Sequence, residues 1–176
     1  MSNYLNPSSS AKIRKIKSLL KLKLHPREGG YFAETYRSRE FLPAENLPGR
    51  YKGKRRFSTA IYYLFTRDSI SLMHRLRSDE IFHFYGGDPV EMLVIGPKGK
   101  GKIIILGSNL HRGESPQVVI PRGFWQGSRL KPRGSYALLG TTVAPGFEYA
   151  DYEHGKQAML LNKYPRFKKT ILSLTR

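Results

Sequence analysis

Cysteine is absent from this sequence of 176 residues, so the chain forms no disulfide bond and offers no thiolate to a metal ion. Long apolar runs are also missing, because no stretch approaches the roughly 18 residues of a membrane-spanning helix. Residues 1–15 lack the apolar core of a secretory signal. With thiol chemistry, membrane insertion and secretion set aside, we expect a soluble cytoplasmic protein without a membrane partner.

Acidic residues are few, with 13 Asp and Glu against 31 Lys and Arg, for a formal net charge of +18. A surface of this charge attracts polyanions, so a nucleic-acid-binding module is one alternative interpretation of the chain. The basic residues are spread over several segments, however, and no known nucleic-acid-binding motif is present. We therefore do not favour nucleic acid as the partner.

The apolar fraction of 39% is enough for one packed core, and no linker divides the chain, so we expect a single domain over residues 1–176. Residues 1–10 read as a flexible polar arm. A helix is predicted from about Ala11, because apolar residues recur at helical spacing: Ile13, Ile16, Leu19 and Leu20. A second helical pattern occupies residues 156–176.

Alternation of period two dominates the chain between these helical segments. About eight short apolar or alternating runs, separated by Gly- and Pro-containing turns, lie between residues 57 and 143. Closely spaced short strands without intervening helices are typical of a sandwich or barrel. The sequence therefore predicts an all-β fold with its barrel core at residues 57–143, one helix before it and one after it.

The segment MHRLRSDEIFHFYGGDP, residues 73–89, holds the most reactive group of side chains. If residues 71–76 form a strand, His74 shares a face with Leu72 and Leu76 and points into the core. A histidine buried beside leucines needs a hydrogen-bonding partner or a ligand, because burying it unpaired is costly.

The next predicted strand places Glu80 on one face together with Phe82 and Phe84, whereas His83 points the other way. A regular strand therefore does not bring Glu80 and His83 to one small ion. An acid on the same interior as His74 indicates either a structural His–Glu hydrogen bond or the polar wall of a ligand pocket.

Two spaced motifs in this region resemble those of the cupin superfamily. The pattern His74-x-Leu76-x3-Glu80-x6-Gly87 is similar to the first cupin motif, in which a second histidine occupies the leucine position. The segment PRGFWQ at 121–126 is similar to the second motif, with a glutamine in the place of the last histidine.

Longer segments make the resemblance more specific. The chain resembles the small single-domain cupins of the fifth cupin group, a domain of unknown function, in three segments: HPREGGYFAETYRS, HRLRSDEIFHFYGGDPVEM and GTTVAPGFEYADYEHG. The resemblance covers roughly residues 18–160. It implies an RmlC-like jelly-roll β-barrel with an N-terminal and a C-terminal helix, a homodimer, and a ligand pocket inside the barrel.

The positions at which this chain departs from the two cupin motifs decide whether it can bind a metal ion tightly. Metal-binding cupins typically use three histidines and a glutamate, and this chain has Leu76 and Gln126 in two of the histidine positions. We therefore expect no cofactor and no tightly bound metal, since such sites normally need three or more strong protein ligands. A weakly held divalent metal on His74, Glu80, His83 and Gln126, with oxygenase chemistry, stays open as an alternative.

The leading interpretation is a small-molecule-binding cupin, with isomerase- or epimerase-like chemistry on a sugar or nucleotide-sugar. His74 is the candidate base and Glu80 its orienting partner. The ligand, sugar-like or anionic, is expected to contact a further group of side chains: Gln126, Phe82, Phe84, Phe124, Tyr63 and Tyr136.

Other side chains receive mainly structural assignments. Trp125 is expected to pack between the sheet and a helix. Phe147 and Tyr149 are expected to close the barrel mouth, with Asp151 paired to one of the many arginines. His25 lies in a loop and carries no visible constellation, so we expect it to be structural.

Overall fold

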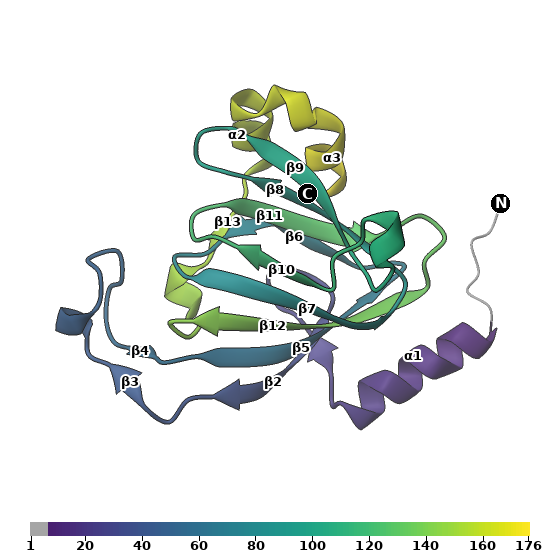
Figure 1. Cartoon of the computed structure of the whole chain (residues 1–176), viewed down its shortest axis with the longest axis horizontal. Coiled ribbons are helices and arrows are strands. Elements are labelled where there is room, and N and C mark those ends of the chain that lie inside the picture. The colour runs from purple at the N-terminus through teal and green to yellow at the C-terminus, as the bar shows by residue number, and fades with distance from the viewer. Residues whose placement is uncertain (1–6) are drawn as a thin grey trace.

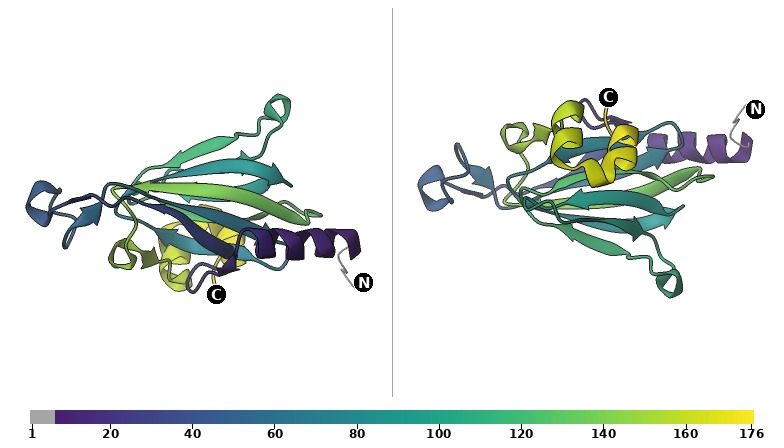
Figure 2. Two further views of the ribbon diagram at one scale, coloured as in Figure 1. Left: turned by 90° about the horizontal axis from the view of Figure 1, so that it is seen from below. Right: turned by 90° about the horizontal axis from the view of Figure 1, so that it is seen from above.

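Two antiparallel β-sheets lie face to face in the computed structural model, which describes residues 7–176 (Figure 1 and Figure 2). The first sheet has the order β1 (Lys23–Leu24), β2 (Tyr31–Arg37), β5 (Thr59–Thr66), β12 (Tyr136–Ala144), β7 (Asp79–Gly87) and β10 (Gln117–Ile120). The second has the order β13 (Glu153–His154), β6 (Ile70–Arg75), β11 (Trp125–Leu130), β8 (Val90–Ile95) and β9 (Gly101–Leu106). The predicted all-β architecture is confirmed.

Alternate residues of the facing strands fill the space between the sheets. Tyr63 and Phe65 of β5 meet Val90, Met92 and Val94 of β8 in one buried cluster. This is the pattern that strand periodicity dictates, since every second side chain points to the same face. The strands from β5 to β12 run from Thr59 to Ala144, close to the predicted core, and β2 extends the first sheet on its N-terminal side.

The opposite face of the second sheet is covered by the C-terminal segment (Figure 1). Trp125 is 2% exposed and packs there between β11 and the helices, as expected. The single predicted C-terminal helix is two short ones, α2 (Gln157–Lys163) and α3 (Lys168–Ser173). A 3-10 turn at Pro165–Phe167 separates them, because proline cannot continue a helix interior.

Helix α1 (Pro7–Leu19) begins four residues before the predicted start at Ala11, since proline fits the first turn of a helix. The first six residues of the predicted arm lie outside the described residues. Ile13 is buried, but Leu19 is 69% exposed, so the expected apolar stripe is only partly covered. Within residues 7–176, no helix has the length and apolar character needed to cross a membrane.

Two excursions from the sheets lie at one end of the molecule. The first runs through β3 (Phe41–Leu42), the 3-10 turn Ala44–Asn46 and β4 (Arg55–Arg56), and projects from the body in Figure 1. The second follows β12 and contains the 3-10 turn Tyr149–Asp151. These two excursions frame the open end of the space between the sheets.

Candidate functional site

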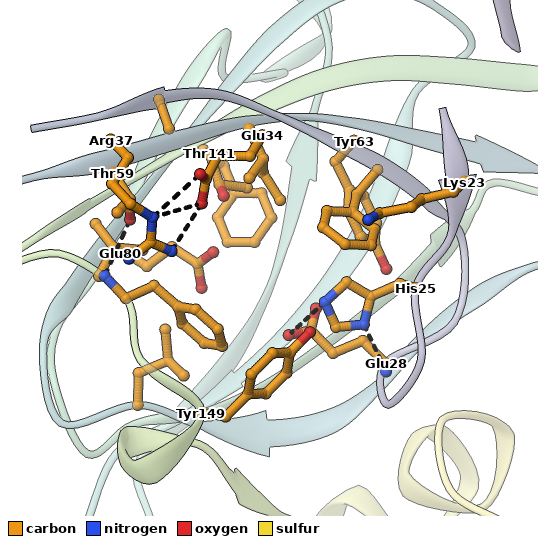
Figure 3. A pocket seen from close by; sticks show the side chains of 17 residues that line it. Lys23, His25, Glu28, Glu34, Arg37, Thr59, Tyr63, Glu80, Thr141 and Tyr149 are labelled. Carbon is orange, nitrogen blue, oxygen red and sulfur yellow. Dashed lines mark hydrogen bonds and ion pairs between the residues drawn. The ribbon is translucent and has the colours of Figure 1, made fainter. Parts of the chain in front are cut away.

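A cavity of about 310 Å³ opens between the sheets at this end (Figure 3). Its apolar walls include Phe32, Ile61, Phe82, Val143 and Phe147. Its polar lining comes from both the strands and the N-terminal segment: Lys23, His25, Glu28, Glu34, Arg37, Thr59, Tyr63, Glu80, Thr141 and Tyr149. An apolar hollow with a limited set of converging polar groups is the usual form of a small-molecule site.

The turn between β1 and β2 places one side of this lining. Gly29 has φ +90° and Gly30 has φ +70°, values that favour glycine. A Cβ atom on Gly29 would clash with the carbonyl oxygen of Ile70, so the turn can approach β6 only with glycine there. The backbone N–H of Leu72 donates to the carbonyl of Glu28 at 2.8 Å, which fixes Glu28 beside β6.

His25 closes the same turn and is not the unconnected loop residue expected from the sequence. Its Nδ1 accepts the backbone N–H groups of Glu28 at 2.9 Å and Arg27 at 3.4 Å. Burial lowers the pKa of His25 to about 4, and the nearby His74 and Arg27 act in the same direction. His25 is therefore neutral at pH 7 and lies with its Nε2 3.8 Å from a carboxylate oxygen of Glu28.

His74 lies behind the cavity lining and is 1% exposed. Its Nδ1 is 2.7 Å from the carbonyl oxygen of Leu72, and because a carbonyl only accepts, Nδ1 carries the proton. The Nε2 lone pair is therefore free to accept a hydrogen bond. The ring of Tyr152 stacks on the imidazole at 5.1 Å between centroids. Burial lowers the pKa of His74, so the ring is neutral at pH 7.

Gln126 joins His74 to Glu80. It pairs with His74 in the register of β11 and β6, whereas Glu80 comes from β7 in the facing sheet. The Gln126 amide nitrogen donates to a Glu80 oxygen at 2.5 Å and lies 3.3 Å from Nε2 of His74. The prediction that Glu80 orients His74 is thus corrected: the Leu72 carbonyl orients the ring, and Glu80 reaches it through an amide.

Glu28 and Glu80 are the two carboxyl groups at the buried end of the cavity (Figure 3). An oxygen of Glu28 is 3.8 Å from Nε2 of His74, so all three side chains belong to one cluster. Burial raises the pKa of Glu28 to about 8. Burial, together with the charge of Glu28, raises the pKa of Glu80 to about 7. Both carboxyls therefore keep a proton to a higher pH than an exposed glutamate does, so each can give or take a proton near neutral pH.

The structure brings together only part of the predicted ligand-contact set. Glu80, Phe82 and Tyr63 line the cavity, whereas His74 and Gln126 are fully buried behind its surface. The hydroxyl of Tyr63 donates to the Gly29 carbonyl, which ties β5 to the glycine turn.

Three predicted contact residues do not line this cavity. Phe84 and Phe124 pack against the core cluster, and Tyr136 lies under the ammonium group of Lys12 from α1, 5.0 Å from the ring centroid. Phe84 shares the inward face of β7 with Phe82 but lies two residues further along the strand, and Phe124 precedes β11 in a turn where its N–H donates to the Pro121 carbonyl. Side chains fill the space between the sheets away from the open end.

The residues do not fit a tightly held transition metal. His83 faces away from the cavity, where its Nε2 lies 3.2 Å from the hydroxyl of Thr142. The lone pair of His25 Nδ1 is used by backbone N–H groups, and Gln126 offers only a neutral amide. Among residues 7–176, no three His, Cys, Asp or Glu side chains are grouped so as to hold a metal ion.

The second excursion covers the cavity mouth. Phe147 and Tyr149 both line the cavity, their rings packed edge to face at 5.1 Å. Asp151, which follows them, is bound by the guanidinium of Arg55 through two hydrogen bonds of 2.7 Å, and both side chains are buried. The predicted pairing of Asp151 with an arginine is confirmed. Arg37 lies at the rim and pairs with Glu34.

A family comparison agrees with this architecture. The model of the family described as "Cupin superfamily (DUF985)" matches residues 14–155. This chain belongs to that family. The cupin resemblance of its two motifs is therefore confirmed, including the resemblance to a group of unknown function.

One relative of this cupin is similar in sequence, and two solved structures are similar in both sequence and fold. Uncharacterized protein YML079W of Saccharomyces cerevisiae is 33% identical over 135 residues, which are 72% of this chain and 67% of the relative. A hypothetical protein from Leishmania major has a TM-score of 0.82 at 31% identity, covering 92% of this chain and 97% of the other. Protein SO0799 from Shewanella oneidensis has a TM-score of 0.81 at 32% identity, covering 92% and 96%.

Oxalate decarboxylase from Bacillus subtilis is similar in fold alone. Its TM-score is 0.52 at 15% identity, and the match covers 87% of this chain and 36% of that enzyme. This likeness supports the jelly-roll architecture, with terminal helices, and carries no statement about activity.

The raised pKa of Glu28 predicts a stability that falls as the solution becomes alkaline. An unfolded chain releases this proton near pH 4.5 and the folded chain near pH 8, so folding loses free energy as the pH rises between these values. His25 acts oppositely, because its lowered pKa removes stability as the pH falls from 6.5 towards 4. Between about pH 6 and pH 8 we expect a loss of about 2 kcal/mol from Glu28.

Urea unfolding of Glu28→Gln at these two pH values measures this loss, with the exposed Glu45→Gln as control. The Glu28→Gln protein should be more stable than the wild type at the higher pH and show a flatter pH dependence. Equal slopes for Glu28→Gln and wild type would show that Glu28 ionises normally in the folded state.

Proposed function

We propose that this cupin binds a small, hydroxyl-rich, sugar-like molecule in the barrel cavity and acts on it as a proton-transferring isomerase- or epimerase-like enzyme. The observation that carries the proposal is the pair of carboxyls, the half-buried Glu28 and the buried Glu80, which line one cavity and are linked to His74 and Gln126. Two carboxyls whose environments keep one protonated and one ionised are suited to acid and base roles on the same ligand.

The proton-transfer step assigns complementary roles to the carboxyls. The ionised carboxylate takes the proton from a carbon next to a carbonyl, and the electron pair of that C–H bond forms a C=C bond. The protonated carboxyl gives its proton to the carbonyl oxygen, so an enediol results and the charges balance. In the second half, the carboxyl that took the proton returns it to the neighbouring carbon, or to the other face of the first carbon, while the now ionised carboxyl removes a hydroxyl proton and a carbonyl re-forms. This completes an isomerisation or an epimerisation.

His74 and Gln126 are positioning residues in this scheme, because both lie behind the cavity surface. The Gln126 amide fixes the Glu80 carboxyl, and the neutral ring of His74 accepts from the same amide. This positioning role replaces the direct base role that was expected of His74 from the sequence.

The ligand's chemistry follows from the lining. Carboxyl groups recognise hydroxyl donors and disfavour an anion beside them, whereas the walls accommodate the apolar face of a sugar ring. A negatively charged portion of the ligand, if present, would have to lie away from Glu28 and Glu80. The expected homodimer stays a prediction, and the proposal does not depend on it.

Solvent exchange tests this function even though the natural substrate is unidentified. The protein is incubated in D₂O with aldoses, ketoses, their phosphate esters and UDP-sugars, and deuterium at carbon is followed by proton NMR. We expect at least one compound to acquire deuterium next to its carbonyl carbon, and to shift the resonances of cavity residues. A panel in which no compound exchanges or binds in the cavity would contradict the proposal.

A further inference from the structure

A second hollow lies at the same end of the molecule and has a different chemistry. It has a volume of about 490 Å³, and four arginines contribute to its lining: Arg50, Arg75, Arg77 and Arg122. We call these four residues and the space between them the arginine pocket. Leu76 lines both this pocket and the barrel cavity, so the two hollows share a wall.

The acidic residues of the arginine pocket are already neutralised. Asp151 binds Arg55 through two hydrogen bonds of 2.7 Å. Glu153 binds Arg75 in the same two-pronged way, at 2.9 and 2.8 Å. Each carboxylate is therefore matched by one guanidinium group, and neither is available to the remaining arginines.

The other three arginines form no ion pair among residues 7–176, and a neighbouring carboxylate, that of Asp79, accepts the backbone N–H of Arg122 at 2.7 Å. Among residues 7–176, no carboxylate oxygen lies within 4.0 Å of a guanidinium nitrogen of Arg50, Arg77 or Arg122. Three like charges around one hollow repel one another, and a bound anion of two or more charges removes that repulsion.

Two of these guanidinium groups are held in place. The side chain of Arg50 donates to the carbonyl of Arg77 at 3.0 Å, and the side chain of Arg77 donates to the carbonyl of Arg50 at 2.9 Å. Arg50 also lies 4.7 Å from the ring centroid of Tyr51, whose hydroxyl contacts the Arg77 carbonyl. Each guanidinium has five N–H donors, so most remain free in a fixed orientation that suits phosphate oxygens.

We propose that the arginine pocket binds the phosphate or diphosphate group of a small molecule whose hydroxylated part occupies the barrel cavity. The assignment of that second part rests on the proposed function. The two hollows differ in their charged groups, because acidic and basic side chains together line the cavity, whereas three arginines without an ion-pair partner among residues 7–176 line the pocket. A ligand that spans them passes over Leu76, between the positions of Arg75 and Arg77. The substrate class is thus a phosphorylated or nucleotide-linked sugar.

Calorimetric titration with inorganic pyrophosphate tests the pocket alone. Arg122→Ala is the main variant, because this side chain is exposed and its removal is expected to leave the fold intact. Arg77→Lys keeps the positive charge but replaces the guanidinium group, which can donate two parallel hydrogen bonds to a phosphate, by an ammonium group, which cannot. The matched control is Arg112→Ala, which removes one exposed arginine from the loop between β9 and β10.

We expect Arg122→Ala and Arg77→Lys each to weaken pyrophosphate binding at least fivefold, and Arg112→Ala to change it less than twofold. Equal affinities for wild type and both pocket variants would overturn the inference, as would an equal loss in the control. An oligonucleotide that binds tenfold more tightly than pyrophosphate and also depends on Arg122 would assign the pocket to nucleic acid instead.

The test of the arginine pocket can fail or succeed independently of the test of the proposed function. Glu80→Gln should bind pyrophosphate like the wild type, because Glu80 is not part of the arginine pocket. Arg122-dependent binding without any deuterium exchange would support the pocket and contradict the enzyme. The opposite result is deuterium exchange into unphosphorylated sugars together with pyrophosphate binding that does not change in Arg122→Ala. That result would contradict the phosphate-binding role of the arginine pocket and leave the proposed function standing.

Discussion

Glu80→Gln is expected to lower the rate of solvent deuterium exchange by a factor of about 10² to 10⁴, the usual contribution of general acid–base catalysis. Glutamine has the size of glutamate but neither takes nor gives a proton near pH 7. The network should survive the change, because the carbonyl oxygen of the new amide can accept from the Gln126 amide nitrogen in place of the carboxylate oxygen.

The control for this variant is Glu40→Gln, which removes an exposed carboxyl from the first excursion. Its exchange rate should stay within twofold of the wild type. Circular dichroism and thermal unfolding verify that Glu80→Gln is folded. A folded Glu80→Gln protein that exchanges as fast as the wild type would remove Glu80 from the acid–base role.

Asp151→Ala is expected to cost about 3 to 5 kcal/mol of unfolding free energy, the usual penalty for leaving a buried charge unpaired. Arg55 and Asp151 are each 4% exposed, and Arg55 keeps only two backbone carbonyls as partners once the carboxylate is gone. The pair also joins the two excursions that frame the cavity, so its loss should loosen the covering rings of Phe147 and Tyr149.

Chemical denaturation of Asp151→Ala beside Glu153→Ala measures this cost. Glu153 makes the same two-pronged contact with an arginine, but its side chain is 54% exposed. Solvent screens such a pair, so Glu153→Ala should cost about 1 kcal/mol or less. If the two variants were destabilised equally, burial of the Arg55–Asp151 pair would contribute nothing.

Strand alternation was sufficient to predict the part of the site that lies on regular strands. His74 and Glu80 point inward because each follows the period of its strand. Gln126 pairs with His74 in the register of β11 and β6 and reaches Glu80 across the space between the sheets. Alternation also turned Phe84 inward, but side chains fill the barrel at that depth, and Phe124 lies in the turn before β11, where strand alternation does not apply.

Glu28 and His25 could not be assigned from local patterns, since they lie on a turn far from His74 in the chain. Their contact depends on a tertiary approach, in which the glycine turn packs against the carbonyl of Ile70. The sequence did show a signal, because the adjacent Gly29 and Gly30 indicate an unusual turn directly after an acid and a histidine.

The arginine pocket was equally hidden in the sequence. Its basic residues come from separated segments, each of which reads alone as ordinary surface charge. The net charge indicated an anionic partner. Only the pairing of each acid with its own arginine shows which arginines of the pocket form no ion pair within residues 7–176.

A carbon-13 NMR titration of the side-chain carboxyls of Glu28 and Glu80 tests the central claim of a shared acid–base pair most directly. The account predicts that both titrate well above the ordinary value of 4.5, near pH 8 and pH 7. In Glu28→Gln the pKa of Glu80 should fall, because the charge of Glu28 helps to raise it. The account would be contradicted if both carboxyls titrated near 4.5 and the pKa of Glu80 were unchanged in Glu28→Gln.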